Sequence, residues 1–205
     1  MVFETKAAER RRRLRDALID AAERAIEKDG LRGLKARDLA HEVGCAVGAI
    51  YNAVTDLDDL VYAVNARTLA ALEDRLTAAG AAGKAGKDAA GRLVQLALAY
   101  LDYAAANTRR WRAVFDHQPM TDRGLPDWYL ADQMRLFSYV EAPLKVLQPK
   151  ADAARRALIA RSLVSAVHGI VVLGLEEKLQ RIPLPTLREQ VTLLSRALAK
   201  GLADD

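Results

Sequence analysis

Apolar side chains recur at three- and four-residue spacing along nearly the whole chain, and no stretch shows the strict alternation of a β-strand. This spacing places the apolar residues on one face of an α-helix. Glycines and prolines fall mostly between the periodic runs, where helices end. The sequence therefore predicts an all-α protein of about nine helices, over residues 8–29, 35–42, 46–53, 57–79, 87–106, 108–115, 127–147, 151–179 and 186–202.

Three features indicate the cellular compartment. Cys45 is the single cysteine, which excludes an internal disulfide and is typical of a reducing compartment. No stretch reaches the roughly eighteen apolar residues that a membrane-spanning helix needs. The chain is also charged from Glu4 onward, unlike a secretory signal. We therefore expect a cytoplasmic protein with no membrane partner.

The residue pattern gives little support for an enzyme. The sequence contains no nucleophile–base pair at a meaningful spacing and no phosphate-binding loop. Asp56, Asp58 and Asp59 are explained by the capping and the dipole of the helix that begins there. His41 and His117 lack a ligand-type partner three or four residues away. We therefore predict no catalytic residue, no metal site and no cofactor.

The segment around Gly44 has the pattern of a helix-turn-helix. Two short expected helices meet at this glycine, which tolerates the backbone angles of a tight turn. Cys45 and Ile50 are expected to face Leu39 and the first helix, which leaves small side chains on the opposite side. Such a helix can lie close to the floor of the DNA major groove. An ordinary corner of a helical bundle has the same pattern, so this signal alone is weak.

Net charge does not by itself indicate a nucleic-acid partner, because it is only +4. Residues 1–15 carry a local charge of +4, whereas residues 16–62 hold five basic and ten acidic residues. The arginines at positions 10–13 are either the solvated start of a helix or an arm that follows DNA phosphates or the minor groove. A DNA-binding hypothesis must therefore rest on this arm and on the geometry of the helix-turn-helix.

The stretch "GLKARDLAHEVGCAVGAIYNAVTDLDDLVYAV", residues 33–64, carries a series of spaced motifs. It has an apolar–alanine pair, an apolar–glycine pair, a glycine followed by an apolar residue and tyrosine, and an apolar residue in the next helix. The residues are Leu39, Ala40, Val43, Gly44, Gly48, Ile50, Tyr51 and Leu60. With this ungapped spacing the stretch resembles the TetR/AcrR family of transcriptional regulators. The nine-helix organisation extends the resemblance over nearly the whole chain.

Five positions depart from the usual residues of that family. Lys35 stands where threonine is usual, and Ala46 replaces the common serine before the recognition helix. Ala53 and Val54 replace the usual His-Phe pair, and Leu57 stands where the family often has a phosphate-binding lysine. The resemblance therefore implies fewer phosphate contacts than usual, for which Lys35, Arg37 and the arginine arm would compensate.

Several side chains of the expected recognition helix match groups on DNA. Asn52 can pair with an adenine edge, and Val47 or Ala49 can contact a thymine methyl group. Tyr51 can donate its hydroxyl to a phosphate. Together with the resemblance, this predicts DNA contacts for Arg12, Lys35, Ala36, Arg37, Ala46, Val47, Ala49, Tyr51 and Asn52.

The second half of the chain offers aromatic and apolar residues for a ligand cavity. Trp111 and Phe115 lie one helical turn apart, and His168 is a polar residue in an apolar helix. Each residue taken alone is better explained by core packing, and the histidine by an ordinary buried partner. The resemblance implies that the set lines an effector cavity, which comprises Tyr100, Tyr103, Trp111, Phe115, Trp128, Met134, Phe137 and His168.

The last two expected helices have features of a dimer surface. One combines small and apolar residues that permit close helix approach, and the other carries an apolar stripe. Such a stripe can equally be buried inside one subunit. In the family these helices pair with their copies in a four-helix bundle, which implies an interface of Ala166, Gly169, Ile170, Leu173, Leu187, Val191, Leu194 and Leu198.

These observations predict a helix-turn-helix DNA-binding domain over residues 8–56 and a ligand-binding and dimerisation domain over residues 57–205. The expected function is that of a ligand-responsive transcriptional repressor. It would bind a pseudo-palindromic double-stranded DNA operator as a homodimer and be released by a small, mainly apolar effector. The alternative is a helical small-molecule-binding protein with weak or lost DNA binding.

Overall fold

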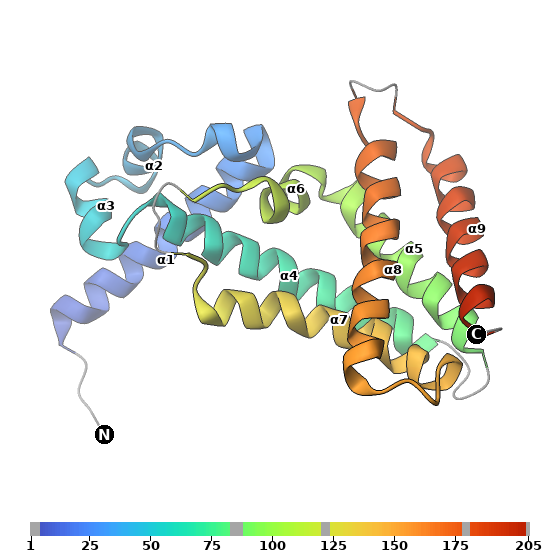
Figure 1. Cartoon of the computed structure of the whole chain (residues 1–205). Coiled ribbons are helices and arrows are strands. Elements are labelled where there is room, and N and C mark those ends of the chain that lie inside the picture. The colour runs from blue at the N-terminus through green and yellow to red at the C-terminus, as the bar shows by residue number, and fades with distance from the viewer. Residues whose placement is uncertain (1–4, 83–87, 120–123, 178–180, 204–205) are drawn as a thin grey trace. The chain divides into compact units, whose positions relative to one another are not determined.

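The computed structural model describes residues 5–82, 88–119, 124–177 and 181–203. It confirms the predicted all-α class, because these ranges hold nine α-helices, one short 3-10 helix and no strand (Figure 1). The elements are α1 (Lys6–Asp29), η1 (Gly30–Gly33), α2 (Ala36–Val43), α3 (Val47–Ala53), α4 (Leu57–Ala82), α5 (Ala89–Ala106), α6 (Thr108–Asp116), α7 (Asp127–Leu147), α8 (Ala153–Gly174) and α9 (Leu184–Ala203).

Local signals determine where several helices begin and end. Asp56 caps α4 as predicted, since its Oδ1 accepts the backbone N–H of Asp59 at 3.1 Å. Asp152 caps α8 in the same way, accepting the N–H of Arg155 at 2.7 Å. Gly30 follows the end of α1 with a φ of 66°, a conformation that favours glycine.

The end of α8 differs from its predicted range. The helix ends at Gly174 because the chain turns there toward α9: the N–H of Ile182 donates to the Gly174 carbonyl at 3.0 Å. A Cβ atom at Gly174 would meet Leu187 Cδ1 at 2.5 Å, so a larger residue here would require the Leu187 side chain to shift. The predicted end at residue 179 and the predicted start of α5 at residue 87 lie outside the described residues.

The chain forms two compact units, and their boundary differs from the predicted one at residues 56–57. Leu60 and Val64 of α4 and Ala113 of α6 are buried in the same core as α1, α2 and α3, which explains the difference. Two stretches make up each unit: unit 1 is Met1–Thr68 with Arg109–Tyr129, and unit 2 is Leu69–Thr108 with Leu130–Asp205.

In unit 2, α9 packs against α5 and α8, which Figure 1 shows side by side. α8 is only partly covered: 17% of its most apolar window is fully buried, and most of its other apolar residues are half-buried. By length and composition alone it is long and apolar enough to cross a membrane, the one such helix among the described residues. Polar residues such as Arg161 and His168 interrupt the apolar sequence of this helix, so the expected absence of an eighteen-residue apolar run still holds. The exposed apolar side chains of α8 make it a candidate interaction surface.

Candidate functional site

The turn between α2 and α3 is built around Gly44. Its φ of 73° lies in the left-handed region, where glycine avoids the strain of a side chain. The N–H of Gly44 donates to His41 O at 3.3 Å and that of Cys45 to Ala40 O at 2.9 Å, which satisfies carbonyls at the end of α2. α1 packs against both α2 and α3. The three helices therefore have the arrangement of a helix-turn-helix domain.

α3 has one buried side and one side facing solvent. The side chain of Ile50 is fully buried, and Cys45 is half-buried against the same core. Tyr51 is 52% exposed and Val47 is 40% exposed, and Asn52 is also exposed. These positions confirm the orientation of the helix that the sequence predicts. The side expected to meet DNA is thus uncovered.

The other predicted DNA-contacting residues lie at or near the starts of α2 and α3. Lys35 and Ala46 occupy the N-cap positions, and neither makes a side-chain capping hydrogen bond. Lys35, Arg37 and Ala46 are exposed, and Ala49 is half-buried. Ala36 instead packs its methyl group against the unit 1 core. A DNA contact from Ala36 would therefore have to come mainly from its backbone.

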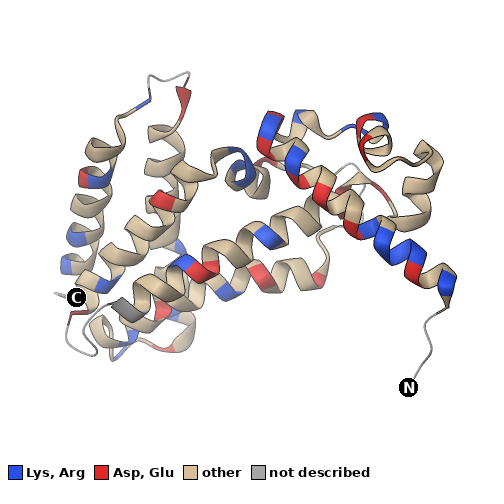
Figure 2. Cartoon of the chain, turned by 180° about the vertical axis from the view of Figure 1, so that it is seen from behind, with Lys and Arg blue, Asp and Glu red and all other residues tan. Residues whose placement is uncertain are grey.

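Basic residues gather on the N-terminal half of α1, as the blue run near the N-terminus shows in Figure 2. Arg10, Arg11, Arg12 and Arg13 are all exposed. Arg13 forms an ion pair with Glu9 one turn away. An exposed pair of this kind contributes little stability, so Arg13 can exchange Glu9 for a phosphate at little energetic cost.

Unit 1 also contains a buried polar cluster that the sequence analysis missed. The fully buried Asn65 donates through Nδ2 to Ala113 O at 3.1 Å and to the Tyr129 hydroxyl at 3.2 Å. The ring centroid of Tyr62 lies 5.1 Å from that of Tyr129 and 5.4 Å from that of His117. These contacts tie α4 to α6 and to the start of α7. The sequence signal was a single asparagine in the apolar stretch "LVYAVNA".

Burial perturbs two titratable groups of this cluster. It raises the pKa of Tyr62, and the neighbouring Asp58 carboxylate adds to that shift. Burial lowers the pKa of His117 below its ordinary value of 6.5, and the Asp58 carboxylate opposes this shift without reversing it. His117 Nε2 lies 3.2 Å from Asp58 Oδ1. The folded protein therefore favours neutral His117 near neutral pH.

Acidification is expected to destabilise unit 1 through His117. The folded-state pKa lies below the unfolded value, so the stability is fully present above about 6.5 and is lost as the pH falls from there toward the folded pKa. His117→Gln should flatten the dependence of the melting temperature on pH in this window. The matched control is His41→Gln, which also removes a histidine but at an exposed position. Equal slopes for wild type and His117→Gln would contradict this expectation.

The predicted effector-cavity residues divide between the two units. In unit 1, Trp111 is a core residue at 1% exposure, whereas Phe115 and Trp128 are about half exposed. The ring centroids of Trp111 and Phe115 lie 5.6 Å apart, so the predicted one-turn spacing does bring these two rings together. The buried position of Trp111 is explained by packing within unit 1.

In unit 2, two of the predicted effector residues are in direct contact. The hydroxyl oxygen of Tyr100 lies 2.6 Å from His168 Nδ1, in a partly buried position. Tyr103 is buried, Phe137 is half-buried and Met134 is 44% exposed. Tyr100 and His168 therefore form a polar contact within unit 2, and the effector role of all five residues stays a prediction.

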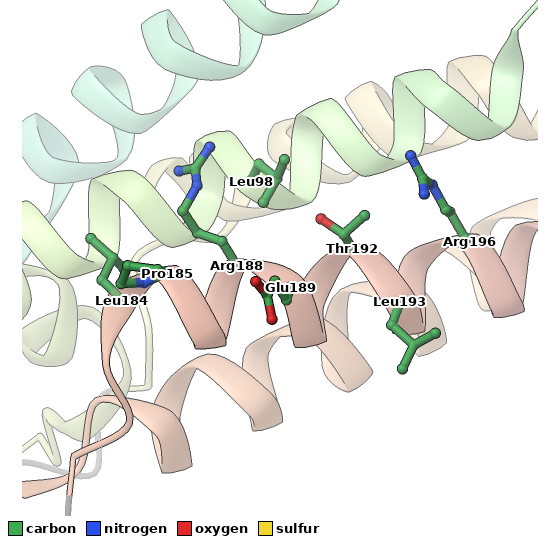
Figure 3. A pocket seen from close by; sticks show the side chains of 8 residues that line it. All are labelled: Leu98, Leu184, Pro185, Arg188, Glu189, Thr192, Leu193 and Arg196. Atoms are coloured by element: carbon green, nitrogen blue, oxygen red, sulfur yellow. The ribbon is translucent and has the colours of Figure 1, made fainter.

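An open groove of about 620 Å³ runs between α5 and α9 in unit 2. Figure 3 shows Arg188, Thr192 and Arg196, spaced one turn apart, on the side of α9 that faces α5. Leu98 of α5 lines the groove with an apolar side chain, and Arg188 of α9 forms an ion pair with Asp102 of α5. None of the eight predicted effector residues lines this groove. It is therefore distinct from the Tyr100–His168 pair.

The predicted dimer residues fall into two groups. Leu187 and Val191 are fully buried inside unit 2, because this side of α9 packs on α5 and α8. They are core residues of one subunit, which corrects their assignment to the interface. Leu173, by contrast, is 60% exposed on α8. The half-buried members of the predicted set are Ala166, Gly169, Ile170, Leu194 and Leu198.

The first compact unit contains a helix-turn-helix, a motif that places its second helix in the DNA major groove, and the second unit is also helical. Residues 93–198 match the family model described as tetracyclin repressor-like, C-terminal domain. This match covers more than half of the chain. The chain therefore belongs to the TetR family of transcriptional regulators.

Solved structures share the fold over most of their length. A protein of unknown function from Rhodococcus sp. RHA1 is 26% identical, with a TM-score of 0.73 over 93% of this chain and 95% of that one. A TetR-family regulator from Bordetella parapertussis 12822 is 16% identical, with a TM-score of 0.61 over 89% and 93%. RolR in complex with resorcinol is 14% identical, with a TM-score of 0.64 over 96% and 95%. No curated protein matches the chain significantly.

Proposed function

We propose that this TetR-family regulator is a cytoplasmic, ligand-responsive repressor that binds a pseudo-palindromic DNA operator as a homodimer. The observation that carries the proposal is the uncovered face of α3. Ile50 anchors this short helix in the core, while Val47 and Tyr51 on the other side remain open to solvent. A helix supported from one side and bare on the other can enter a major groove.

The proposed contacts divide into base and backbone contacts. Asn52 would pair with an adenine edge, and Val47 would contact a thymine methyl group. Tyr51, Lys35 and Arg37 would contact phosphates, which position the helix without reading sequence. The arginine arm of α1 would add electrostatic affinity along the backbone or the minor groove.

The proposed dimer interface is the uncovered apolar face of α8 with the adjoining part of α9. Leu158 and Leu173 of α8 and Leu193 of α9 are between 60% and 65% exposed, so most of each side chain is open to a partner. A second copy of the same surface would bury them around a two-fold axis. Such an axis would present two α3 helices to the two half-sites of an operator.

The proposed effector is a small, mainly apolar molecule with a group that hydrogen-bonds. Tyr100 and His168 form a partly buried polar pair in unit 2, and the fold relative RolR was solved with resorcinol. Such a molecule would release DNA only if it bound more tightly to an arrangement of the two α3 helices that does not fit the operator. Its differential affinity for the two arrangements would set the size of the response.

A second candidate function is a helical small-molecule-binding protein without DNA binding. The departures at Lys35, Ala46, Ala53 and Leu57 favour it, because they remove residues that commonly contact phosphate in this family. The two candidates differ in one property, which is affinity for DNA.

The test is selection of DNA fragments by the purified protein, followed by affinity measurements at several salt concentrations. A repressor should enrich an inverted-repeat sequence and bind it with an affinity that falls about a hundredfold between 50 and 200 mM salt, as expected for roughly four phosphate contacts. Enrichment of no sequence, with a weak affinity for all DNA, would favour the carrier instead.

A further inference from the structure

Arginines stand at two of the three points where the chain passes between the compact units. The chain crosses at residues 68–69, 108–109 and 129–130. Arg67 lies just before the first crossing on α4, and Arg109 and Arg110 follow directly after the second on α6. All three side chains reach α1, the helix on which α2 and α3 pack.

Glu23 of α1 binds two of these arginines at once. Its Oε2 accepts from Arg67 Nη1 at 2.6 Å, and its Oε1 lies 2.7 Å from Arg110 Nη1. The side chains of Glu23 and Arg110 are only 19% and 14% exposed. Charge-assisted bonds in such a sheltered position are stronger than those of an exposed pair. One carboxylate therefore joins α4 and α6 to α1.

Further contacts reinforce this junction. Arg67 also donates to Asp20 Oδ1 at 2.7 Å, and Arg110 Nη1 also donates to Glu27 Oε1 at 3.1 Å. Arg110 Nε donates to the hydroxyl of the buried Thr68 at 3.3 Å, which links the two crossings to each other. The residues nearest both crossings are thus held against one segment of α1.

We propose that Glu23 is the positioning residue that transmits movements of α4 and α6 to the DNA-binding helices through α1. This inference rests on the proposed function, since it concerns how unit 2 controls DNA binding. α4 continues from Thr68 into unit 2, and α6 begins at Thr108, the last residue before its crossing. A displacement of the unit 2 side of either crossing therefore continues into Arg67 or Arg110. Because both arginines share Glu23, neither helix can shift without moving α1 or breaking a charge-assisted bond.

The fluorescence of Trp111 offers a direct test, because Trp111 is buried on α6 next to Arg110. The chain has two tryptophans, so Trp128→Phe leaves Trp111 as the single reporter. In this background, DNA selected by the wild-type protein should shift the Trp111 emission. Glu23→Gln should abolish most of that shift and lower DNA affinity by less than about threefold, because it removes a charge without touching the DNA-facing side of α3.

The matched control is Glu73→Gln. Glu73 of α4 likewise bridges to another helix, through Arg135 Nη2 at 3.0 Å, and its side chain has a similar exposure of 23%, but it lies in unit 2 and makes no hydrogen bond or ion pair with α1 among the described residues. This variant should keep the full Trp111 response. Arg110→Gln breaks the same junction from the α6 side and should show the same loss of the Trp111 emission shift. It therefore tests the junction even when Glu23→Gln folds poorly.

The outcomes separate this inference from the proposed function. A full Trp111 shift in Glu23→Gln and Arg110→Gln, or equal losses in Glu73→Gln, would overturn the role of Glu23. Binding of selected DNA by the Trp128→Phe protein without any Trp111 shift would overturn it too, while leaving the repressor proposal intact. Failure of the wild-type protein to bind any DNA would instead remove the proposed function on which the inference rests.

Discussion

Leu173→Glu is expected to convert the proposed dimer into monomers and to abolish operator binding at concentrations where the wild-type protein is saturated. Leu173 is 60% exposed on α8, so the substitution costs little within one subunit. At a two-fold interface, however, it buries two carboxylates with no partners. We expect dimerisation to weaken by about a hundredfold or more, since each 1.4 kcal/mol of desolvation costs a factor of about ten.

The loss of DNA binding follows from geometry rather than from any change in α3. A monomer contacts one half-site, so it loses the benefit of linking two recognition helices on one duplex. Sedimentation at several protein concentrations measures the first effect, and mobility shifts with selected DNA measure the second. Leu125→Glu is the matched control, because Leu125 is 46% exposed outside α8 and α9. A Leu173→Glu protein that remains dimeric would place the interface elsewhere.

Tyr51→Ala is expected to weaken DNA binding by about tenfold or more while leaving the dimer and the melting temperature nearly unchanged. The side chain is 52% exposed, so its removal leaves no cavity in the core. The expected loss combines a phosphate hydrogen bond with the contact area of the ring. Fluorescence anisotropy with selected DNA and thermal unfolding provide the two measurements.

Tyr51→Phe separates the contributions of the hydroxyl and the ring. If the hydroxyl donates to a phosphate, Tyr51→Phe should show a clear part of the loss and a reduced salt dependence. A large fall in melting temperature for Tyr51→Ala would mean that Tyr51 supports the fold. In that case the uncovered face of α3 would not be the DNA-reading face.

The helices and the orientation of α3 were predictable because their signals are local. The cap at Asp56, the turn at Gly44 and the buried position of Ile50 depend on residues within one or two helical turns. The predicted range of α8 was too long because the chain turns after Gly174 and approaches α9 there, with Gly174 close to Leu187. Sequence periodicity carries no information about that approach.

The assignment of apolar stripes was less predictable. Leu187 and Val191 belong to the stripe expected at the dimer surface, yet α5 and α8 bury them within the subunit. Leu173 lies on a helix of similar apolar character and remains open. A periodic pattern shows which side of a helix must be covered, but not whether the same subunit or another copy covers it.

The sequence by itself determined the all-α class, the positions of most helices, the helix-turn-helix and the outward face of α3, because periodicity, capping and turn chemistry act between near neighbours. Only the tertiary structure decided that α6 belongs with the DNA-binding unit, that α8 is only partly covered and that Glu23 joins two helices. Those features depend on contacts between residues far apart in the chain, 44 positions from Glu23 to Arg67 and 83 from Glu27 to Arg110. Partners at such separations are chosen by the packing of whole helices, which no local pattern encodes.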